Sequence, residues 1–475
     1  MLLCLVMILQ LSCQKKTGID APTIEITDPD VNNLNPTVDL NLDLSNEVTS
    51  STVSPDFLGF SYEKTILTDG SYFTASNLTL VNLYKNLGSG MIRIGGNRVE
   101  NTKWSNGSRG TSEDNNTVFT SDVDRYKSFD DAVGWRTMWG LNFGTINIQD
   151  NADEANYTNK KLGTMIQSFA IGNEPDFISY SGYRPKDYTY EAYRNEYKKY
   201  SDQLLKLVPG IKLSGSESVV PYWQIQFAKD FSSRINMLTG HYYVQGPAGD
   251  KSVSITKLLI PDPKLVDEVT TCLEQARKIN VPYRLSETNT VTGGGQNKIS
   301  NAHASALWGT NFLFYLAQSG VSGVNFHGGN GLPYTPIDKV DGQMVARPLY
   351  YGMLLFHLGQ PKQFLKNNLQ TQSDKYNSYY FDRTDGKKGI ILINKDDGNN
   401  ISVSINGAGS VKNVTQYNLQ GNNLASLTST NINSATVGKN GIIDTKPVSV
   451  KLVNNSLSDT RIKVYSGSAC LLILE

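Results

Sequence analysis

The sequence predicts an α/β fold, an eight-stranded (β/α)8 TIM barrel with an accessory β-sandwich domain. Eight short apolar runs lie between residues 57 and 327, and helical stretches separate most of them, which is the pattern of a parallel barrel. After about residue 356 the pattern changes to short alternating strands, which is typical of a β-sandwich. The length of 475 residues suits one barrel of about 250–300 residues plus a smaller domain.

The chain begins with a short apolar run over residues 1–13, which ends in Leu-Ser-Cys. This run is too short to span a bilayer as a helix and is typical of a signal peptide. A small residue before Cys13 resembles a bacterial lipobox, and that resemblance implies cleavage and lipidation at Cys13. We therefore expect an exported protein that is lipid-anchored at the bacterial cell envelope, in the periplasm or on the outer-membrane surface. Secretion without an anchor is the alternative.

A second domain is predicted from both ends of the remaining chain. Residues 14–35 are polar and rich in Asp, Asn, Pro and Thr, so they are predicted to form a flexible tether. Apolar and polar residues then alternate, as in a half-buried strand. We expect residues 36–50 to pair with residues 356–475 in one discontinuous β-sandwich, which leaves residues 51–355 for the catalytic barrel.

The barrel strands are assigned to the eight apolar runs, which are Phe57–Glu63, Met91–Gly96, Arg136–Phe143, Ile166–Asn173, Lys212–Glu217, Ile235–Tyr243, Tyr283–Asn289 and Gly323–His327. The clearest helix covers residues 189–207, where large side chains recur on one face and Thr189 is a suitable N-cap. Further helices are predicted over 263–279 and over 301–319, the second ending at Gly320. The connection between the third and fourth runs is short and has no clear helical pattern.

The composition disfavours several classes of partner and cofactor. Lys plus Arg and Asp plus Glu both number 44, so the formal net charge is zero, whereas nucleic acid or an anionic membrane would favour a basic face. Membrane contact is expected only through a lipid at Cys13. The sequence has no HExxH pair, no CxxC or disulfide pattern and no Walker-type loop. We therefore expect no metal and no cofactor, and buried free thiols at Cys272 and Cys470.

Two glutamates follow apolar runs at the predicted carboxyl-terminal rim of the barrel, where barrel active sites lie. Glu174 lies in the segment 170–176, where Pro175 removes a backbone donor and ends the fourth strand. Glu287 lies in the segment 283–289, at the end of the seventh run. Runs four and seven face each other across the barrel mouth, so the two carboxyl groups are predicted to meet there.

Cleavage of a glycosidic bond needs such a pair of carboxyl groups. One donates a proton to the leaving oxygen, and in retaining enzymes the other is an ionised nucleophile about 5–5.5 Å away, so that a covalent glycosyl-enzyme can form. The nucleophile needs positive or hydrogen-bonding neighbours, whereas the acid needs partial burial or a nearby negative charge. The 25 tyrosines add flat faces that can stack on sugars, although most are expected at the core boundary.

A larger, ordered set of motifs resembles glycoside hydrolase family 79, which holds β-glucuronidases and heparanase within a clan of retaining glycosidases. The matches run in order over about residues 55–355, and the set is more specific than any one motif. They are Phe57–Glu63, Met91–Asn97, Gly140–Gly144, Ile171–Asp176, Arg284–Asn289, Gly293–Gly295, Gly323–Gly328 and Arg347–Gly352.

The resemblance implies roles for individual residues. Glu174 would be the acid/base and Glu287 the nucleophile. Asn173 would hydrogen-bond the 2-hydroxyl of the sugar, a contact that strengthens in the transition state. Arg93 would keep Glu287 ionised, and Tyr243 would hold the same carboxylate through its hydroxyl.

Further candidates lie at the ends of other runs. Adjacent strand residues face opposite ways, so Tyr242 competes with Tyr243 for the contact with the nucleophile until the register is known. Glu63 and Asn97, at the ends of the first and second runs, are candidates for binding sugar hydroxyls. His327, in the eighth run, is another candidate for contacting the substrate.

The loop after the nucleophile bears on the choice of sugar. Family members that take glucuronic acid seat its carboxylate there, and Gly293, Gly294 and Gly295 match that loop. Glycines let backbone N–H groups approach an anion closely. The tyrosine that precedes these glycines in the family is replaced here by Thr292, which has less reach, and this departure puts the preference for a uronic acid in doubt.

The leading hypothesis is a retaining exo-β-glycosidase, specifically a β-D-glucuronidase that acts on oligosaccharides or glucuronides. The first alternative keeps the mechanism and changes the sugar to a neutral one, in line with Thr292. A heparanase-like endo mode is less favoured because the balanced charge does not indicate a basic cleft. A third hypothesis, a carbohydrate-binding lipoprotein without turnover, is disfavoured by the presence of both glutamates.

Overall fold

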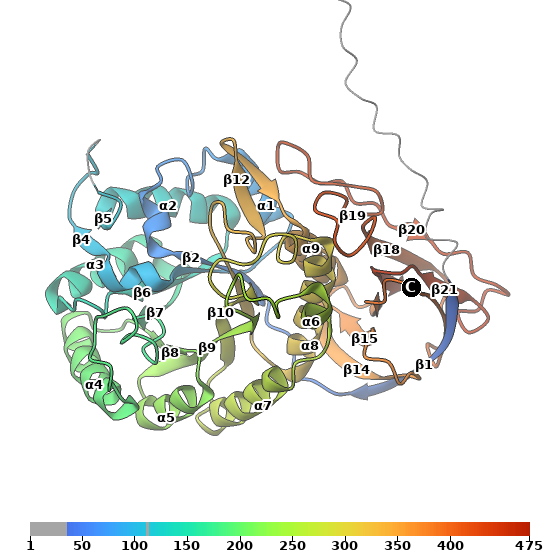
Figure 1. The fold of residues 1–475 in the computed structure, drawn as a ribbon, viewed down its shortest axis with the longest axis horizontal. Helices are drawn as coiled ribbons and strands as arrows, with labels where there is room; N and C mark the ends of the chain where they lie inside the picture. The colour runs from blue at the N-terminus through green and yellow to red at the C-terminus, as the bar shows by residue number, and fades with distance from the viewer. Residues whose placement is uncertain (1–35, 111–113) are drawn as a thin grey trace, which may run out of the picture.

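The structure, a computed structural model, describes residues 36–110 and 114–475. The predicted leader (1–13), with Cys13, and the predicted tether (14–35) lie outside these residues. The described chain forms a closed parallel barrel and a large, mostly antiparallel sheet packed beside it (Figure 1). The predicted fold class is therefore confirmed.

Eight parallel strands close the barrel, and each overlaps one of the predicted apolar runs. In barrel order they are Leu58–Glu63 (β2), Met91–Gly95 (β3), Arg136–Leu141 (β6), Ile166–Ile171 (β7), Leu213–Ser218 (β8), Ile235–Gln245 (β9), Tyr283–Val291 (β10) and Val324–Gly328 (β11). Most of their residues are buried, because side chains fill the barrel and helices cover its outside. This burial on both faces explains why such strands read as nearly continuous apolar runs.

The helices of the described chain are Leu78–Lys85 (α1), Thr120–Val133 (α2), Ile148–Leu162 (α3), Tyr190–Leu207 (α4), Pro221–Phe231 (α5), Ile255–Leu259 (α6), Pro263–Lys278 (α7), His303–Ser319 (α8) and Pro348–Gly359 (α9). Shorter elements are the 3-10 helices Lys64–Thr68, Asn97–Asn101 and Gly163–Met165 and the strand pairs β4 (Lys103–Ser105) with β5 (Thr117–Phe119) and β12 (Ile337–Val340) with β13 (Gln343–Ala346). Helices α4, α7 and α8 confirm the three predicted ones. The Thr189 hydroxyl caps α4 by accepting from the Ala192 N–H, and Gly320 ends α8 with a φ of 94°.

The expectation of a short, irregular connection between the third and fourth strands was wrong, because α3 fills it. Its buried face combines small apolar residues with polar ones, so it shows little apolar periodicity. Glu154 on this face pairs with Lys64 at 2.6 Å, and both side chains are almost fully buried. The Asn147 side chain caps the helix by accepting from the Asp150 N–H. A helix whose buried face is partly ionic cannot be recognised from an apolar stripe.

The second unit is a ten-stranded sheet with the order β19-β18-β22-β16-β15-β14-β1-β17-β21, in which β20 also pairs with β18. Its strands are Thr37–Val48 (β1), Pro361–Leu369 (β14), Tyr376–Arg383 (β15), Lys388–Asn394 (β16), Asn400–Asn406 (β17), Val414–Gln420 (β18), Asn431–Ile432 (β19), Val448–Ser449 (β20), Arg461–Val464 (β21) and Ser468–Leu474 (β22). Strand β1 lies between β14 and β17, as predicted for the early N-terminal strand.

This sheet is hydrogen-bonded continuously, yet it encloses a core as a sandwich does. Leu42 of β1 and Val403 of β17 belong to one buried cluster with Leu392 of β16 and Leu472 of β22. The alternate residues of β16 and β22, such as Ile391, join the core of the barrel instead. One sheet can therefore serve two cores, because successive side chains on a strand point to opposite faces.

The sheet packs on the side of the barrel formed by α8 and α9 (Figure 1). Phe314 of α8 lies 5.5 Å, between ring centroids, from Phe381 of β15. Cys272 and Cys470 are buried free thiols, as predicted. Within residues 36–110 and 114–475, no helix combines the length and apolar character needed to cross a bilayer.

Candidate active site

The two predicted glutamates lie together at the carboxyl-terminal end of the barrel. Glu287 is on β10, and Glu174 lies in the turn just after β7. Glu174 has a φ of 44°, a conformation that costs free energy for a residue with a side chain. Its N–H donates to the Glu217 carbonyl at 2.8 Å, so the backbone of β8 holds this turn in place.

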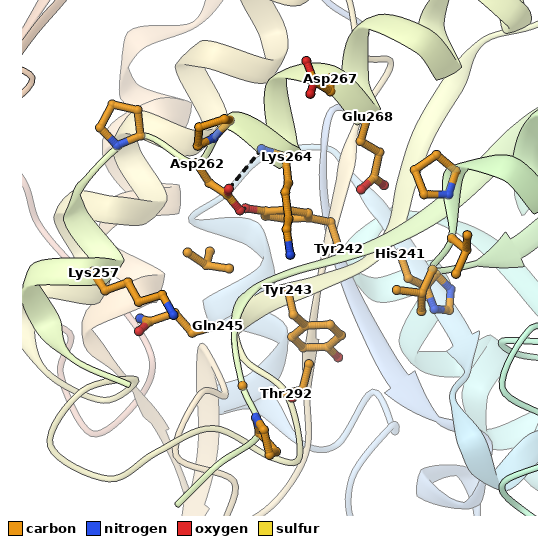
Figure 2. A pocket seen from close by; sticks show the side chains of 18 of the residues that line it. His241, Tyr242, Tyr243, Gln245, Lys257, Asp262, Lys264, Asp267, Glu268 and Thr292 are labelled. Carbon is orange, nitrogen blue, oxygen red and sulfur yellow. Dashed lines mark hydrogen bonds between the residues drawn. The ribbon is translucent and has the colours of Figure 1, made fainter. Parts of the chain in front are cut away.

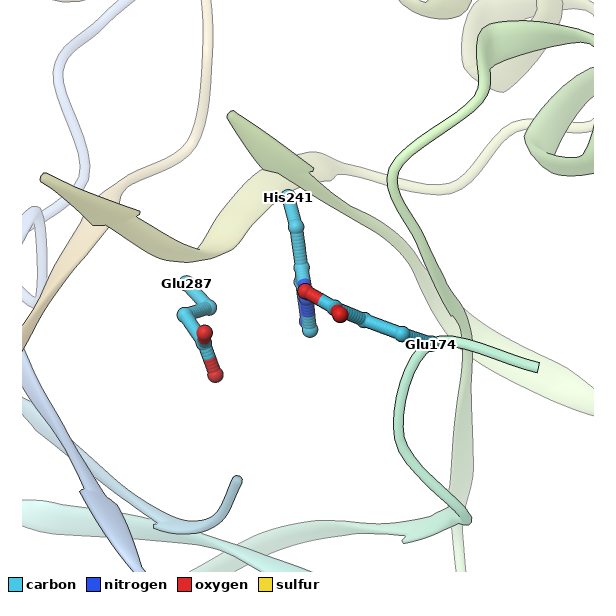
Figure 3. A group of neighbouring side chains, drawn as sticks. All are labelled: Glu174, His241 and Glu287. Carbon is cyan, nitrogen blue, oxygen red and sulfur yellow. The ribbon is translucent and has the colours of Figure 1, made fainter. Parts of the chain in front are cut away.

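One carboxylate oxygen of Glu174, one of Glu287 and a ring nitrogen of His241 lie within 4.8 Å of one another (Figure 3). Both carboxyl groups face a cavity of about 510 Å³. The side chain of Glu287 is 7% exposed, whereas that of Glu174 is 19% exposed. The two groups are thus close enough to act on one atom between them, and they differ in their access to solvent.

Arg93 of β3 is the buried cation of the site. Its guanidinium donates to Glu287 Oε2, to Asn173 Oδ1 and to the Ser61 hydroxyl at 2.7, 2.7 and 2.9 Å. It also forms an ion pair with Glu217 Oε2 at 2.7 Å. The planar guanidinium has several donors in a fixed geometry, so it can position two carboxylates and one amide at once.

The register of β9 resolves the choice between the two neighbouring tyrosines. Tyr243 donates its hydroxyl to Glu287 Oε1 at 2.8 Å, whereas Tyr242 points the other way and donates to Asp262 at 2.6 Å. Burial alone would raise the pKa of Glu287, but His327, His241 and Arg93 together hold that pKa well below its usual value, and the Tyr243 hydroxyl adds to the effect. Glu287 is therefore ionised at neutral pH.

Two buried residues of the site were missed by the sequence reasoning. His241 lies two positions before Tyr243 on β9 and so shares its face; its Nδ1 is 3.0 Å from Glu174 and its Nε2 is 3.2 Å from Glu217. Glu217 also accepts from the hydroxyls of Thr239 and Ser286 at 2.7 and 3.1 Å. The two-residue spacing from Tyr243 could have identified His241. Nothing in the local sequence distinguishes Glu217 from a solvent-exposed residue at the end of a strand.

The charges of His241 and Glu217 depend on each other. Burial would lower the pKa of His241, but Glu287, Glu174 and Glu217 raise it to about 9. Burial would raise the pKa of Glu217, but Arg93 and His241 lower it to about 2. At neutral pH the buried core of the site thus holds two cations, Arg93 and His241, beside the carboxylates of Glu217 and Glu287.

The donor set Glu174, His241 and Glu287 is compact enough to be considered as a cation site. Its charges do not fit that role. A protonated imidazole has no free lone pair to offer a metal, and Arg93 already donates to the Glu287 carboxylate. The arrangement is better suited to holding and moving protons.

Of the residues predicted to contact sugar hydroxyls, Glu63, Asn97 and His327 line the same cavity, whereas Asn173 is 3% exposed and is not part of its lining. Glu63 Oε2 accepts from the Arg98 N–H at 2.7 Å, and burial raises the pKa of its carboxyl group. Asn97 Oδ1 accepts from the Asn173 amide at 3.0 Å. His327 lies between Glu63 and Glu287, with its ring nitrogens 3.9 and 3.4 Å from their carboxylates. His327 thus touches the nucleophile candidate as well as the cavity.

The glycine loop is divided between the cavity and the core. Thr292, Gly293 and Gly294 line the cavity, together with Tyr334. Gly295 does not: a Cβ at this position would lie 2.6 Å from the Tyr334 backbone nitrogen. The three glycines have φ values of 76°, 93° and 88°, all in the region that favours glycine. Of the three predicted glycines, Gly293 and Gly294 thus border the cavity, and Gly295 packs behind the loop.

Comparison with known proteins gives distant but consistent relatives. No protein-family model matches the chain. A β-glucuronidase from Aspergillus niger is 24% identical over 216 residues, which are 40% of this chain and 40% of that protein. A β-glucuronidase from Neurospora crassa is 24% identical over 261 residues, 48% of this chain and 46% of that one. The chain thus matches less than half the length of these curated relatives.

Solved structures share the fold over nearly the whole chain. A 4-O-α-L-rhamnosyl-β-D-glucuronidase from Fusarium oxysporum has a TM-score of 0.70 and 16% identity, covering 92% of this chain and 100% of that one. An α-L-arabinofuranosidase from Thermotoga maritima has a TM-score of 0.69 and 16% identity, covering 91% and 99%. At such identities the likeness concerns the fold. It agrees with the predicted barrel and accessory sheet, while family 79 itself is not assigned.

Proposed function

We propose that this chain is a retaining exo-β-glycosidase, and that its substrates are β-D-glucuronides or oligosaccharides that end in β-glucuronic acid. The observation that carries the proposal is the pair Glu174 and Glu287, with carboxylate oxygens within 4.8 Å of each other on one cavity. Retaining glycosidases hold their two carboxyl groups about 5–5.5 Å apart, whereas inverting ones leave about 6.5–9.5 Å for a water molecule.

The proposed reaction has two displacements. In the first, Glu287 attacks the anomeric carbon while Glu174 donates its proton to the leaving oxygen, so a glycosyl ester forms and an alcohol departs. In the second, Glu174 takes a proton from water, and the resulting hydroxide displaces Glu287 to give the free sugar. The lowered pKa of Glu287 supports its role as the ionised partner. The greater exposure of Glu174 supports its exchange of protons with leaving group and water.

The neighbouring polar groups are proposed to orient this exchange. Asn173 is fixed by Arg93 at its oxygen and by Asn97 through one amide hydrogen, which leaves the second amide hydrogen for the sugar 2-hydroxyl. Glu63 and His327 are proposed to bind other hydroxyls of the same ring. Arg93 and Tyr243 hold Glu287 in the orientation from which it attacks.

A uronic acid is supported by the glycine loop and by the relatives named β-glucuronidase. Backbone N–H groups at Gly293 and Gly294 can approach a carboxylate without interference from side chains. A neutral sugar is the second candidate, because Thr292 lacks the reach of a tyrosine and the carboxyl group of Glu63 also faces this cavity. Comparing 4-nitrophenyl β-D-glucuronide with the corresponding glucoside decides between them, and a preference for the glucoside would overturn the uronate assignment.

The two catalytic roles are tested by Glu287→Gln and Glu174→Gln. Each change is expected to lower kcat on the aryl β-glucuronide by at least about a thousandfold while the fold is kept. Azide should restore turnover to the Glu174 variant through a glycosyl azide, but not to the Glu287 variant. Proton NMR of the first sugar released tests retention, and an α-configured product would exclude Glu287 as the nucleophile.

We further propose that the protein acts outside the cytoplasm, either through a lipid anchor at Cys13 or after secretion. The support is the apolar leader over residues 1–13 and the small residue before Cys13. Mass spectrometry of the mature amino terminus after expression in a bacterial host tests the anchor. A diacylglyceryl group on Cys13 is expected, and a mature chain that retains residues 1–12 would contradict it.

A further inference from the structure

A second and larger cavity, of about 1150 Å³, opens beside the first one (Figure 2). It lies along β9 and the loop that joins α6 to α7. Phe177, Val219, Tyr243 and Thr292 line both cavities. The second cavity also reaches His241, which contacts Glu174. A molecule held in the first cavity could therefore continue into the second one past Glu174, on the side where the leaving oxygen receives its proton.

One part of the wall is apolar although it faces solvent. Phe177, Val220 and Ile260 line the cavity and are 39%, 39% and 54% exposed. Four prolines extend this surface; they are Pro221, Pro247, Pro261 and Pro263. Exposed apolar side chains gathered around one hollow indicate a binding surface rather than a random surface feature. Their flat faces suit the C–H faces of sugar rings.

The inner wall carries one carboxyl oxygen that lacks a hydrogen-bond partner. Glu268 of α7 is 8% exposed, and its Oε1 has no hydrogen-bond partner among the described residues. Burial raises the pKa of this carboxyl group to about 8, so at neutral pH it is a neutral group that can both donate and accept. Buried polar atoms are nearly always satisfied, so this unmet capacity indicates a hydrogen-bonding ligand. Figure 2 shows Glu268 and Lys264 directed toward the centre of the residues drawn.

These features distinguish between possible occupants. A purely apolar group would cover Glu268 and Lys264 without offering them hydrogen bonds, which costs free energy. A sugar chain offers both hydroxyls and apolar ring faces. The volume of about 1150 Å³ is larger than the range of about 300–1,000 Å³ that is usual for sites of drug-sized ligands, so the cavity has room for more than a single sugar ring.

We propose that this cavity binds the leaving-group half of the substrate and takes an oligosaccharide of at least two sugar units. The inference rests on the proposed glycosidase activity. It adds that the length of the substrate is recognised on the leaving-group side of the bond that is cleaved. The terminal sugar occupies the cavity of Glu174 and Glu287, and the rest of the chain lies between Val220 and the α6–α7 loop. Glu268 then receives a hydrogen bond from, or donates one to, a sugar hydroxyl.

Tryptophan variants test this assignment through substrate selection. Val220→Trp and Ile260→Trp each fill part of the cavity, and both parent side chains are exposed, so the fold should tolerate them. Two substrates with the same terminal sugar are compared: a β-glycoside whose leaving group is a tetrasaccharide, and the 4-nitrophenyl β-glycoside. The measurement is kcat/KM for the first substrate divided by kcat/KM for the second. This ratio is expected to fall about tenfold or more in both variants. Leu207→Trp, on the exposed face of α4, is the matched control and should keep the parent ratio.

Glu268 provides an independent arm of the same test. Glu268→Leu removes the hydrogen-bonding group and is expected to lower the ratio, whereas Glu268→Gln keeps a donor and an acceptor of similar size and should largely restore it. If the ratio stays within about twofold of the parent in the tryptophan and leucine variants, the cavity is not the leaving-group site.

If the protein cleaves no glycoside, the proposed function is wrong, but binding to the cavity can still be tested. Ligand-observed NMR with xylotetraose, cellotetraose and laminaritetraose then measures binding to the full chain directly. Binding that Val220→Trp and Ile260→Trp abolish supports the cavity as an oligosaccharide site. Absence of binding to the parent chain, or binding that these variants leave intact, overturns the proposal.

Discussion

At the scale of single residues, the site is organised by a balance of buried charges. Glu217 is fully buried, and it contacts Arg93 and His241, the two cations that also contact Glu287 and Glu174. Each cation thus connects a carboxylate that faces the cavity to one that does not. This third carboxylate explains how two cations can be kept beneath the cavity, since neither is left without a buried counter-charge.

Arg93→Met tests this balance. The change removes the guanidinium shared by Glu217 and Glu287 while keeping much of its volume, so it leaves two buried carboxylates short of a partner. The free energy of unfolding is expected to fall by about 3–5 kcal/mol, measured by urea denaturation at pH 7. Because the pKa of Glu287 should rise, the acid limb of kcat/KM should also move to higher pH. An unshifted acid limb in a folded variant would contradict the role of Arg93.

Tyr243→Phe tests the contact that fixes the orientation of Glu287. The loss of one hydrogen bond to the proposed nucleophile is expected to lower kcat by about 10–100-fold, with a smaller effect on KM. Tyr242→Phe is the matched control, since it removes the hydroxyl bound to Asp262 on the opposite face of the same strand. Equal losses in the two variants on the aryl glycoside would show that the register of β9 does not govern the chemistry.

At the scale of the elements, the strands were easier to predict than the residues behind them. All eight barrel strands could be located because burial on both faces makes each an apolar run. The same reasoning failed for α3, whose buried face carries Glu154 and other polar groups. It also missed Glu217 and His241, because a polar residue on a strand gives no sign in the sequence of whether it faces solvent or buried partners. Choosing between Tyr242 and Tyr243 needed the strand register, which composition does not contain.

The glycine loop yields a prediction that compares neighbouring positions on one element. Gly293→Ala places a Cβ in ordinary van der Waals contact, with its nearest neighbour at 3.8 Å, whereas Gly295→Ala places one 2.6 Å from the Tyr334 backbone. Both changes strain a positive φ by about 1 kcal/mol, but only Gly295→Ala must also displace the segment that carries Tyr334. Urea denaturation should therefore show a clearly larger loss of stability for Gly295→Ala. Similar losses would indicate that the loop does not pack on Tyr334.

At the scale of the whole molecule, the sheet joins the two ends of the described chain and is fixed to the barrel. Strand β1 is held between β14 and β17, and Thr49 and Val53, just beyond it, bond to the backbone of β14. The chain thus enters the first barrel strand from a fixed position. Because α8 and α9 bury aromatic residues against the sheet, barrel and sheet are expected to unfold together, and the stability of the buried site should be visible in global unfolding.

That coupling allows the charge of His241 to be measured as a pH dependence of stability. Its pKa in the folded chain is about 9, above the value of about 6.5 for an unfolded histidine. The imidazolium therefore contributes stability that is fully present below about pH 6.5 and is lost as the pH rises through about 9, in total about 3 kcal/mol. Burial also raises the pKa of Glu268 to about 8 and those of Glu100 and Asp130 to about 7. Their contributions to stability fall over overlapping ranges of pH, so the parent chain alone cannot isolate the contribution of His241.

His241→Gln isolates the contribution of the histidine. The variant should be less stable than the parent at pH 6, because Glu217 loses its charged partner, and the difference between the two should shrink steadily between pH 6.5 and 9.5. Urea midpoints at closely spaced pH values supply the measurement, with Glu268→Gln as the control that removes a different titrating group. A difference between parent and His241→Gln that stays constant over this range would mean that the buried imidazole is neutral, and the balance of two cations against Glu217 and Glu287 would have to be abandoned.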